Sequence, residues 1–432
     1  MNPSDLMTSE PSTSAATALS TPAPDRAARA AVLERRRARR GTAEQEFTSD
    51  FSALMAQVKE AGLLARRPGW NTMRFVLLGL GYVVSFGMLF LIGESWWQMA
   101  TAVVFGALFT QTAYVAHDAA HRQIFTNGKT GEWVSTIIGN LFIGLSYGWW
   151  LKKHNALHHA NPNKAGVDGD IAPGALVFVA EDARQRTGFA KWFAARQGWF
   201  FLPLLTLAGL QLHVESVKAI ARGQSSIKRR WIEGVFIGIR LIGFPALAIW
   251  AAGPLIGSGF FLVQLAVFGV HMGGSFAPNH KGQPIVPKDV KIDFLRRQTL
   301  MSRNISGGRF MGFLMGGLNY QIEHHLFPSM PSVNLHRVQP MVREYCRQKD
   351  ITYTETTLLE SYRIIIAYLN RVGLGEADPF DCPVTAQFRS ADGDTCSTVP
   401  AGKRRTSGEM IVGAGDPFGI AFGRGLYRCV GS

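Results

Sequence analysis

Cysteine is scarce in this 432-residue chain, and an N-terminal apolar segment is missing. The four cysteines form no CxxC pair and no dense, evenly spaced framework. This excludes a disulfide scaffold and a cysteine zinc site, and it suits a reducing compartment. The first 25 residues are rich in Ser, Thr, Ala and Pro and lack the apolar core of a cleaved secretory signal. Membrane insertion is therefore expected to depend on internal segments.

Charge is also scarce, since Asp, Glu, Lys and Arg make up 18% of the residues, against 47% hydrophobic residues. This composition lies on the apolar side for a soluble protein and indicates a membrane protein. Acidic residues are the rarer kind, with 31 Asp and Glu against 45 Lys and Arg. Because the basic residues cluster beside hydrophobic segments, anionic lipid headgroups rather than nucleic acid are their expected counterpart.

Long apolar runs occur as two close pairs. Phe75 to Ile92 is followed after a short link by Trp96 to Ala116, and Val235 to Ala252 is followed by Leu255 to Met272. About 20 residues of helix cross a bilayer, so each pair predicts two transmembrane helices joined as a tight hairpin.

Two shorter apolar stretches, residues 134–150 and 199–212, lie between these pairs. Their length favours interfacial or re-entrant helices over spans. Lys and Arg flank the hairpins, whereas the hairpin tips carry one acidic residue and no basic one. By the positive-inside rule, four spans place both termini in the cytoplasm. The basic flanks are Arg66, Arg67, Arg74, Lys152, Lys153, Lys228, Arg229, Arg230, Lys281, Lys288, Lys291, Arg296 and Arg297.

The pattern as a whole predicts an all-α integral membrane protein in three parts. Residues 1–50 are of low complexity, end in a run of arginines and predict a disordered basic arm. Residues 51–375 predict the membrane domain, in which the mixed polar and apolar part after residue 289 forms a cytoplasmic helical cap. Residues 376–432 predict a disordered tail. Helices of the cap are expected at 335–349 and 358–372.

Eight of the eleven histidines lie close to the predicted cytoplasmic boundary. His117 and His121 are four residues apart, as are His154 and His158, so each pair is expected on one face of a helix. Neutral imidazole is the commonest metal ligand in proteins, which makes these residues candidates for a metal site. The candidate ligands are His117, His121, His154, His158, His159, His280, His324 and His325, and Gln321 stands three residues before His324.

Eight histidines are too many for one zinc ion, which takes about four ligands when structural and about three when catalytic. Two metal ions are therefore predicted. Nitrogen ligands suit iron, copper or zinc, so residue types alone leave the metal open. His213, His271 and His336 have no clustered partner and are expected to be structural, although His271 ends a span, where ionisable side chains are usually functional.

From about residue 70 to 372, the sequence resembles the membrane fatty acid desaturase family, in particular its front-end or linoleoyl-CoA type. The resemblance rests on HDAAH at 117–121, HNALHH at 154–159, FAPNHKG at 276–282 and QIEHHLFP at 321–328. It implies a di-iron centre held by the eight clustered histidines, O2 as the oxidant, and a long-chain fatty acyl substrate carried by coenzyme A or by a lipid. Gln321 stands where many relatives have a histidine.

The resemblance also implies a separate electron donor. A His-Pro-Gly-Gly motif, which marks a fused haem domain in many relatives, does not occur in either tail. A ferredoxin, or a flavin and iron-sulfur reductase, is therefore the expected partner, and the basic cytoplasmic surface is expected to steer it. The acyl chain is expected to lie in an apolar tunnel whose depth selects the methylenes that react. The location implied is the plasma or inner membrane, with the active site on the cytoplasmic side.

Three alternatives remain open at this stage. A hydroxylase or ketolase of the same di-iron group would return oxygen to the substrate instead of removing a second hydrogen. An intramembrane metalloprotease would use the HDAAH spacing, but it needs a glutamate beside the first histidine, where Asp118 stands. A metal transporter would place its ligands near the bilayer midplane on broken helices, rather than at one face.

Overall fold

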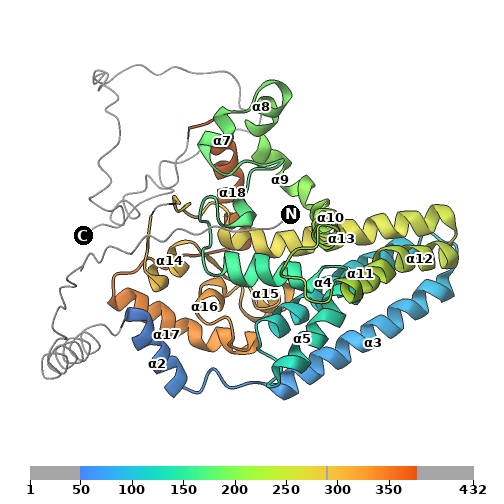
Figure 1. The fold of residues 1–432 in the computed structure, drawn as a ribbon, viewed down its shortest axis with the longest axis horizontal. Helices are drawn as coiled ribbons and strands as arrows, with labels where there is room; N and C mark the ends of the chain where they lie inside the picture. Colours follow the sequence, from blue (N-terminus) through green and yellow to red (C-terminus); the bar gives the residue numbers. More distant parts are fainter. Residues whose placement is uncertain (1–48, 289, 377–432) are drawn as a thin grey trace, which may run out of the picture. The chain divides into compact units, whose positions relative to one another are not determined.

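The computed structural model describes residues 49–288 and 290–376, whose regular structure is helical apart from one pair of two-residue strands (Figure 1). The predicted basic arm and C-terminal tail lie outside the described residues, except at their inner ends. The first described helix is α2 (Asp50–Glu60).

Four helices are long and apolar enough to cross a membrane, and each coincides with one of the predicted spans, although α4 begins two residues after the start of its predicted span. They are α3 (Pro68–Ile92), α4 (Gln98–Ala120), the continuous helix Arg230–Ala252 and α13 (Pro254–His280). The third consists of α11 (Arg230–Gly238), the π-helical turn η4 (Ile239–Gly243) and α12 (Phe244–Ala252). Helices α4 and α13 continue by about one and two turns past their apolar runs. His117 and His280 therefore lie within helices.

The contacts between these helices decide which of them lie inside. Helix α13 packs along α4 and α12, and α3 packs along α4. Of the most apolar part of each helix, 56% is buried in α4 but only 17% in α3. Val83 and Leu91 of α3 are 71% and 89% exposed. Large apolar side chains with this exposure form a surface suited to lipid.

Aromatic rings fill the contact between α4 and α12, around a buried arginine. The ring centroids of Phe109 and Phe244 lie 5.3 Å apart. The guanidinium of Arg240 lies 4.1 Å from the centre of the Phe109 ring. Its Nε donates to the backbone oxygen of Phe142 at 2.8 Å. The rings and the carbonyl together explain how a charged side chain is accommodated within an apolar helix.

Two further helix pairs are sharply bent. Helix α5 (Gly128–Thr136) continues as the π-helix η1 (Ile137–Ile143), and α6 (Tyr147–Trp150) continues as the π-helix η2 (Leu151–His158). The two halves meet at 109°, through Gly144 with a φ of 83° that favours glycine. Helices α9 (Gln197–Leu205) and α10 (Ala208–Ala221) meet at 75°. If each bent pair is counted as a span, there are up to six candidate spans. The interfacial or re-entrant placement of the two bent pairs therefore stays a prediction.

The polar part of the fold consists of short helices and one minimal sheet. Helices α17 (Leu335–Gln348) and α18 (Leu358–Gly373) confirm the helices predicted at 335–349 and 358–372 to within one residue at each end. Strands β1 (Asn304–Ile305) and β2 (Glu355–Thr356) pair in parallel, which departs from the all-α prediction. The remaining elements are η3 (Gly169–Ile171), α7 (Ala180–Arg184), α8 (Gly188–Ala194), α14 (Phe294–Leu300), α15 (Gly308–Leu314), α16 (Gln321–Leu326) and η5 (Ser332–Asn334).

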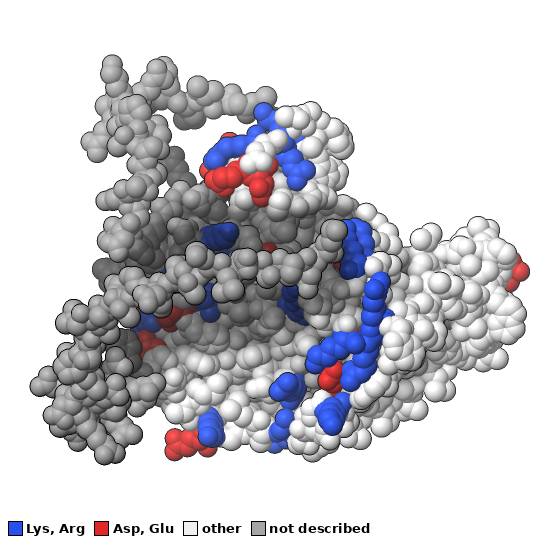
Figure 2. Space-filling model, viewed as in Figure 1, with Lys and Arg blue, Asp and Glu red and all other residues white. Residues whose placement is uncertain are grey.

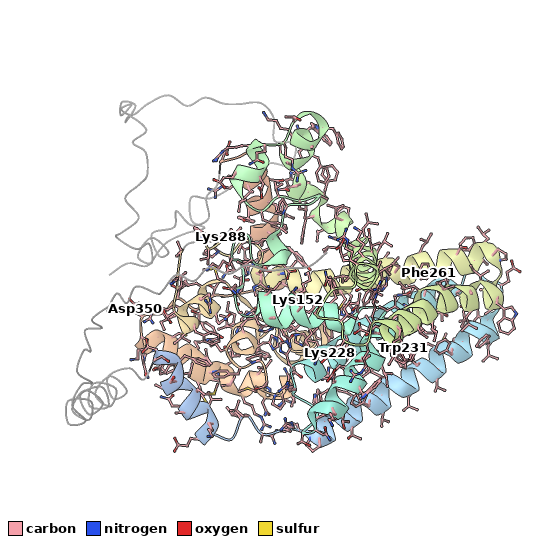
Figure 3. The ribbon with its side chains drawn as sticks, viewed as in Figure 1. Lys152, Lys228, Trp231, Phe261, Lys288 and Asp350 are labelled. Carbon is pink, nitrogen blue, oxygen red and sulfur yellow. The ribbon has the colours of Figure 1, made fainter. Side chains whose placement is uncertain are left out.

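Basic side chains gather beside the apolar helices. Figure 2 shows Lys and Arg grouped along the base of the long helices, whereas the face of those helices turned to the viewer is free of them. Figure 3 labels Lys228 and Trp231 at the start of α11, and Trp231 is 75% exposed. Tryptophan next to Lys and Arg at the end of an apolar helix is typical of a membrane–water interface.

The close approach of α13 to the α9–α10 bend predicts that Gly269→Ala destabilises the protein. A Cβ at Gly269 would lie 2.5 Å from the backbone oxygen of Leu205, which cannot move without shifting a helix. The expected cost is about 1–3 kcal/mol, seen as a lower unfolding temperature of the detergent-solubilised protein. Gly79→Ala in α3 is the matched control, because no atom lies within 4 Å of its added Cβ. Equal unfolding temperatures for the two variants would contradict this packing.

Candidate metal centre

All eight histidines predicted as ligands converge in the structure, although the outermost are about 200 residues apart in the sequence. The end of α4 supplies His117 and His121, and the end of α13 supplies His280. The π-helix η2 and the residue after it supply the HNALHH histidines, and α16 supplies the last two. Each of the eight is at most 7% exposed.

The first group contains five imidazoles whose ligand atoms all lie within 4.8 Å of one another. Nε2 of His154 lies 3.2 Å from Nε2 of His117 and 3.1 Å from Nε2 of His159. Nitrogens that bind one ion at about 2.1 Å are separated by about this distance. The group consists of His117, His121, His154, His159 and His324.

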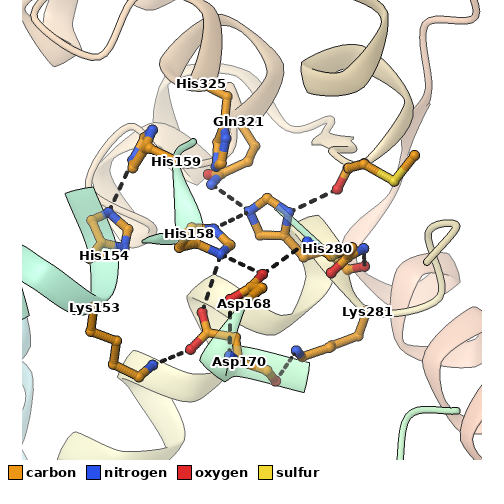
Figure 4. Close-up of polar contacts among 12 residues, drawn as sticks. Lys153, His154, His158, His159, Asp168, Asp170, His280, Lys281, Gln321 and His325 are labelled. Atoms are coloured by element: carbon orange, nitrogen blue, oxygen red, sulfur yellow. Dashed lines mark hydrogen bonds and ion pairs between the residues drawn. The ribbon is translucent and has the colours of Figure 1, made fainter. Parts of the chain in front are cut away.

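The second group contains His158, His280 and His325, again with ligand atoms within 4.8 Å of one another. Nε2 of His158 and Nε2 of His280 lie 3.3 Å apart. Gln321 joins this group, since its Nε2 lies 2.9 Å from Nε2 of His280. Its Oε1 accepts a hydrogen bond from Asn279 at 3.1 Å. Figure 4 shows His158, His280, Gln321 and His325 around a common space.

The HNALHH segment divides its histidines between the two groups in a way that the spacing did not predict. His117 and His121 share a helical face as expected, with ring centroids 4.6 Å apart. The rings of His154 and His158 are stacked with centroids 5.5 Å apart, but their ligand atoms belong to different groups. They lie in a π-helix, whose i to i+5 hydrogen bonds align His154 with His159.

The other ring nitrogen of several ligands is held by a fixed partner. Nδ1 of His158 lies 2.9 Å from a carboxylate oxygen of Asp168. Nδ1 of His280 lies 2.9 Å from the backbone oxygen of Met301, and Nδ1 of His325 lies 3.0 Å from Oε1 of Gln298. A proton on Nδ1 leaves the lone pair of Nε2 directed at the shared space. Buried Nε2 atoms without a hydrogen-bond partner are those of His121, His324 and His325.

Asp168 belongs to a polar network that the sequence analysis missed (Figure 4). The same carboxylate accepts from the backbone N–H of Asn163 at 2.9 Å. Burial alone would raise the pKa of Asp168, but the hydrogen bond and charge of His158 lower it. Next to it, Asp170 pairs with Lys153, and its backbone oxygen accepts from Lys281. No spacing signal marks Asp168, because nine residues separate it from His158 in the sequence.

The electrostatics of the site favour the neutral form of four of the imidazoles. Burial, followed by the neighbouring imidazoles, lowers the pKa well below that of free histidine for the ligands outside the spans, namely His121, His159, His324 and His325. Metal binding requires the unprotonated ring, so these surroundings favour the form that binds.

Two of the three histidines expected to be structural bond to backbone oxygens away from both groups. Nε2 of His213 lies 2.9 Å from the oxygen of Ile143, and Nε2 of His271 lies 2.8 Å from the oxygen of Leu314. Neither these two nor His336 belongs to a group of ligand atoms within the described residues.

An apolar cavity of about 40 Å³ adjoins the first group at His117. Ala113, one helical turn before His117 on α4, and Met272 on α13 form part of its wall. The same two helix faces continue to Phe109 and Phe268, both buried. The rest of its wall comes from the bent pair of α5–η1 and α6, so the cavity lies where this pair meets α4 and α13.

The protein has long apolar helices, and two of them end at a buried centre lined by histidines. These features define an integral membrane protein with a site suited to metal. The chain belongs to the fatty acid desaturase family, whose model matches residues 94–357. The protein is therefore an oxidoreductase that desaturates fatty acyl chains, as the histidine motifs predicted.

Individual relatives agree with this assignment. The chain is similar to the Delta(8)-fatty-acid desaturase of Helianthus annuus, at 26% identity over 77% of this chain and 75% of the relative. It is also similar to the Delta(5) fatty acid desaturase fat-4 of Caenorhabditis elegans, at 28% identity over 71% of this chain and 70% of the relative. The Delta(6)-fatty-acid desaturase fat-3 of the same organism is 26% identical over 76% of each chain.

Proposed function

We propose that the eight histidines hold two iron ions and that the protein uses O2 to place a double bond in a long-chain fatty acyl group. The observation that carries the assignment is that the imidazoles form two groups whose ligand nitrogens lie within 4.8 Å of one another, while partners such as Asp168 bond to the other ring nitrogen. When bound, such an iron pair supplies O2 reduction: two hydrogens from neighbouring methylenes, two donated electrons and two protons convert O2 to two waters.

The two groups assign the ligands of each ion. His117, His121, His154, His159 and His324 would hold the first ion. His158, His280 and His325 would hold the second ion, with Gln321 beside His280 as a fourth side chain. The partners at Nδ1 would fix the tautomer of each ring and its direction.

The protein's own contribution is to orient the acyl chain and keep water away from it. The wall of the cavity beside His117 is apolar, and α4 and α13 hold it in a fixed place relative to the histidines. A chain entering it would bring a limited set of methylenes to the first group. The phenyl rings of Phe109 and Phe268, one turn deeper on the same helices, would limit how far the chain extends.

The membrane arrangement that fits this function has two hairpins, α3–α4 and α12–α13, with both termini and the site on the cytoplasmic side. The basic residues at the ends of the apolar helices support this orientation. Residues 51–375 would form the membrane domain, between a basic arm and a C-terminal tail. A ferredoxin, or a flavin and iron-sulfur reductase, would supply electrons from the cytoplasm.

Gas chromatography of fatty acid methyl esters tests the activity directly. Cells that produce the protein are expected to contain an unsaturated fatty acid that is missing from cells without it. The position of the new double bond gives the regiochemistry of the reaction. A hydroxylated or keto product in its place would assign the alternative chemistry of the same group. Purified protein is expected to contain two iron atoms per chain.

Ala113→Phe is expected to slow desaturation by about tenfold or more while leaving bound iron unchanged. The phenyl ring would fill the cavity next to His117, and a steric cost of about 1.4 kcal/mol already corresponds to a factor of ten. Val104→Phe on the same helix is the control, because Val104 is 45% exposed on the outer side. Equal turnover by the two variants would show that the acyl chain lies elsewhere.

A further inference from the structure

Two buried ionisable side chains lie on one face of the third candidate span. Glu233 on α11 and Arg240 on η4 are seven residues apart, a spacing that directs both toward the same side of a helix. Ionisable residues inside a span are costly and are usually functional. Both contact the bend where η1 ends and α6 begins, and η1 packs against α11 and η4.

Arg240 holds the end of η1. Its Nε donates to the backbone oxygen of Phe142 at 2.8 Å, and its Nη2 donates to Oε1 of Gln264 on α13 at 3.2 Å. The next carbonyl along the chain, that of Ile143, lies 2.9 Å from Nε2 of His213. The last carbonyl groups of a helix have no partner within it, so these side chains satisfy the end of η1.

Glu233 holds the start of α6. Its carboxylate accepts from the hydroxyl of Ser146 at 2.6 Å and from the backbone N–H of Gly148 at 3.3 Å. The backbone N–H of Ser146 donates to the hydroxyl of Ser216 on α10 at 3.2 Å. The first N–H groups of a helix have no partner within it. The third span therefore binds both halves of the bend, one through a guanidinium and the other through a carboxylate.

The bend forms one wall of the apolar cavity beside His117. Ile143 and Leu145, on either side of Gly144, line this cavity. A Cβ at Gly144 would lie 3.1 Å from Cγ of Arg240, so the turn packs directly against the arginine. The position of the bend therefore sets the distance between the cavity wall and the histidines.

We propose that Glu233 and Arg240 are positioning residues that fix this wall, so that one pair of methylenes of the acyl chain reaches the metal centre. The proposal rests on the proposed function and adds the source of its positional selectivity. Neither residue lines the apolar cavity or belongs to a histidine group, so both act through the bend. If the wall at Ile143 and Leu145 could move, neighbouring methylenes would reach the same place.

Hydrogen exchange of the full-length, detergent-solubilised protein tests the contact without requiring turnover. The backbone N–H groups of residues 145–149 all donate to groups in or around the bend, so their exchange requires it to open. Arg240→Met is expected to speed this exchange by about tenfold or more, because a charge-assisted hydrogen bond is lost. Arg240→Lys keeps a charged donor and is expected to restore most of the protection.

The matched control for hydrogen exchange is Ile242→Met. Ile242 is 73% exposed on the same π-helical turn as Arg240, so its replacement leaves the bend unchanged. Exchange of residues 145–149 in Arg240→Met that equals the exchange in this control overturns the proposal.

The position of the double bond is the readout that a purely structural role would not move. Gas chromatography with mass spectrometry is expected to show that Arg240→Met raises the share of product with a displaced double bond by about tenfold, compared at equal iron content. Arg240→Lys is expected to lower that share again. Glu233→Gln, which removes the charge at the other half of the bend, is expected to displace the double bond in a second, nearly isosteric variant.

An unchanged double-bond position in both Arg240→Met and Glu233→Gln overturns the proposal. If the wild-type protein produced no unsaturated product, the proposed function would fail, while hydrogen exchange would still decide whether Arg240 holds the bend.

Discussion

His158→Ala and His325→Ala are each expected to abolish desaturation and to lower the iron content from two atoms per chain toward one. Both residues belong to the smaller group, which has three histidines and Gln321. Losing one leaves two imidazoles, fewer than the three or so protein ligands that an open catalytic site keeps. Metal analysis of the purified variants, together with gas chromatography of the products, measures both effects.

The appropriate control is a histidine outside both groups. His336→Ala is expected to retain two irons and full activity, because His336 is not near either set of ligand atoms. The five-histidine group would stay intact in both test variants, so an iron content near one, rather than zero, is the informative value. Two irons and normal turnover in His325→Ala would refute the ligand assignment.

Asp168→Asn is expected to reduce iron affinity or turnover by about 10–100-fold, although Asp168 would not touch the metal. Its carboxylate accepts from Nδ1 of His158 at 2.9 Å and from the backbone N–H of Asn163 at 2.9 Å. Asparagine removes the negative charge and keeps only one acceptor oxygen, so either these two bonds or the bond from the backbone N–H of Asp170 to the other oxygen is lost. His158 would then be a weaker, less well oriented ligand of the second ion.

A positioning role for Asp168 makes a prediction that a purely structural role does not. The iron affinity of Asp168→Asn, measured by competition with a chelator, is expected to fall while the unfolding temperature of the metal-free protein stays close to wild type. Asp350→Asn is the control, because Asp350 is exposed and belongs to neither histidine group. Unchanged iron affinity in Asp168→Asn would remove it from the metal centre.

The sequence predicted best those features that depend on residues close together in the chain. An apolar run long enough to cross a bilayer is a property of consecutive residues, so all four long helices were predicted, as were α17 and α18. The eight histidines and the family were identified in the same way, because their types and short spacings are visible without the fold.

Other features depend on contacts between distant segments. The parallel pairing of Asn304 with Glu355 and the apolar cavity beside His117 arise only when the chain is folded. Asp168 and Gln298 carry no sequence mark as partners of histidine. Asp168 contacts the ring of a histidine that lies 10 positions away in the sequence, and Gln298 contacts the ring of one that lies 27 positions away.

The sequence by itself determined that the chain has four long apolar helices and enough histidine for two metals, since hydrophobic length and ligand type are properties of the residues. Only the tertiary structure decided which imidazoles share a centre. His154 and His158 go to different groups because η2 is wound as a π-helix, and His324 and His325 go to different groups although they are neighbours. The type of helix and the packing of its neighbours set the direction of each Nε2 atom, and this direction cannot be deduced from the spacing of histidines in the sequence.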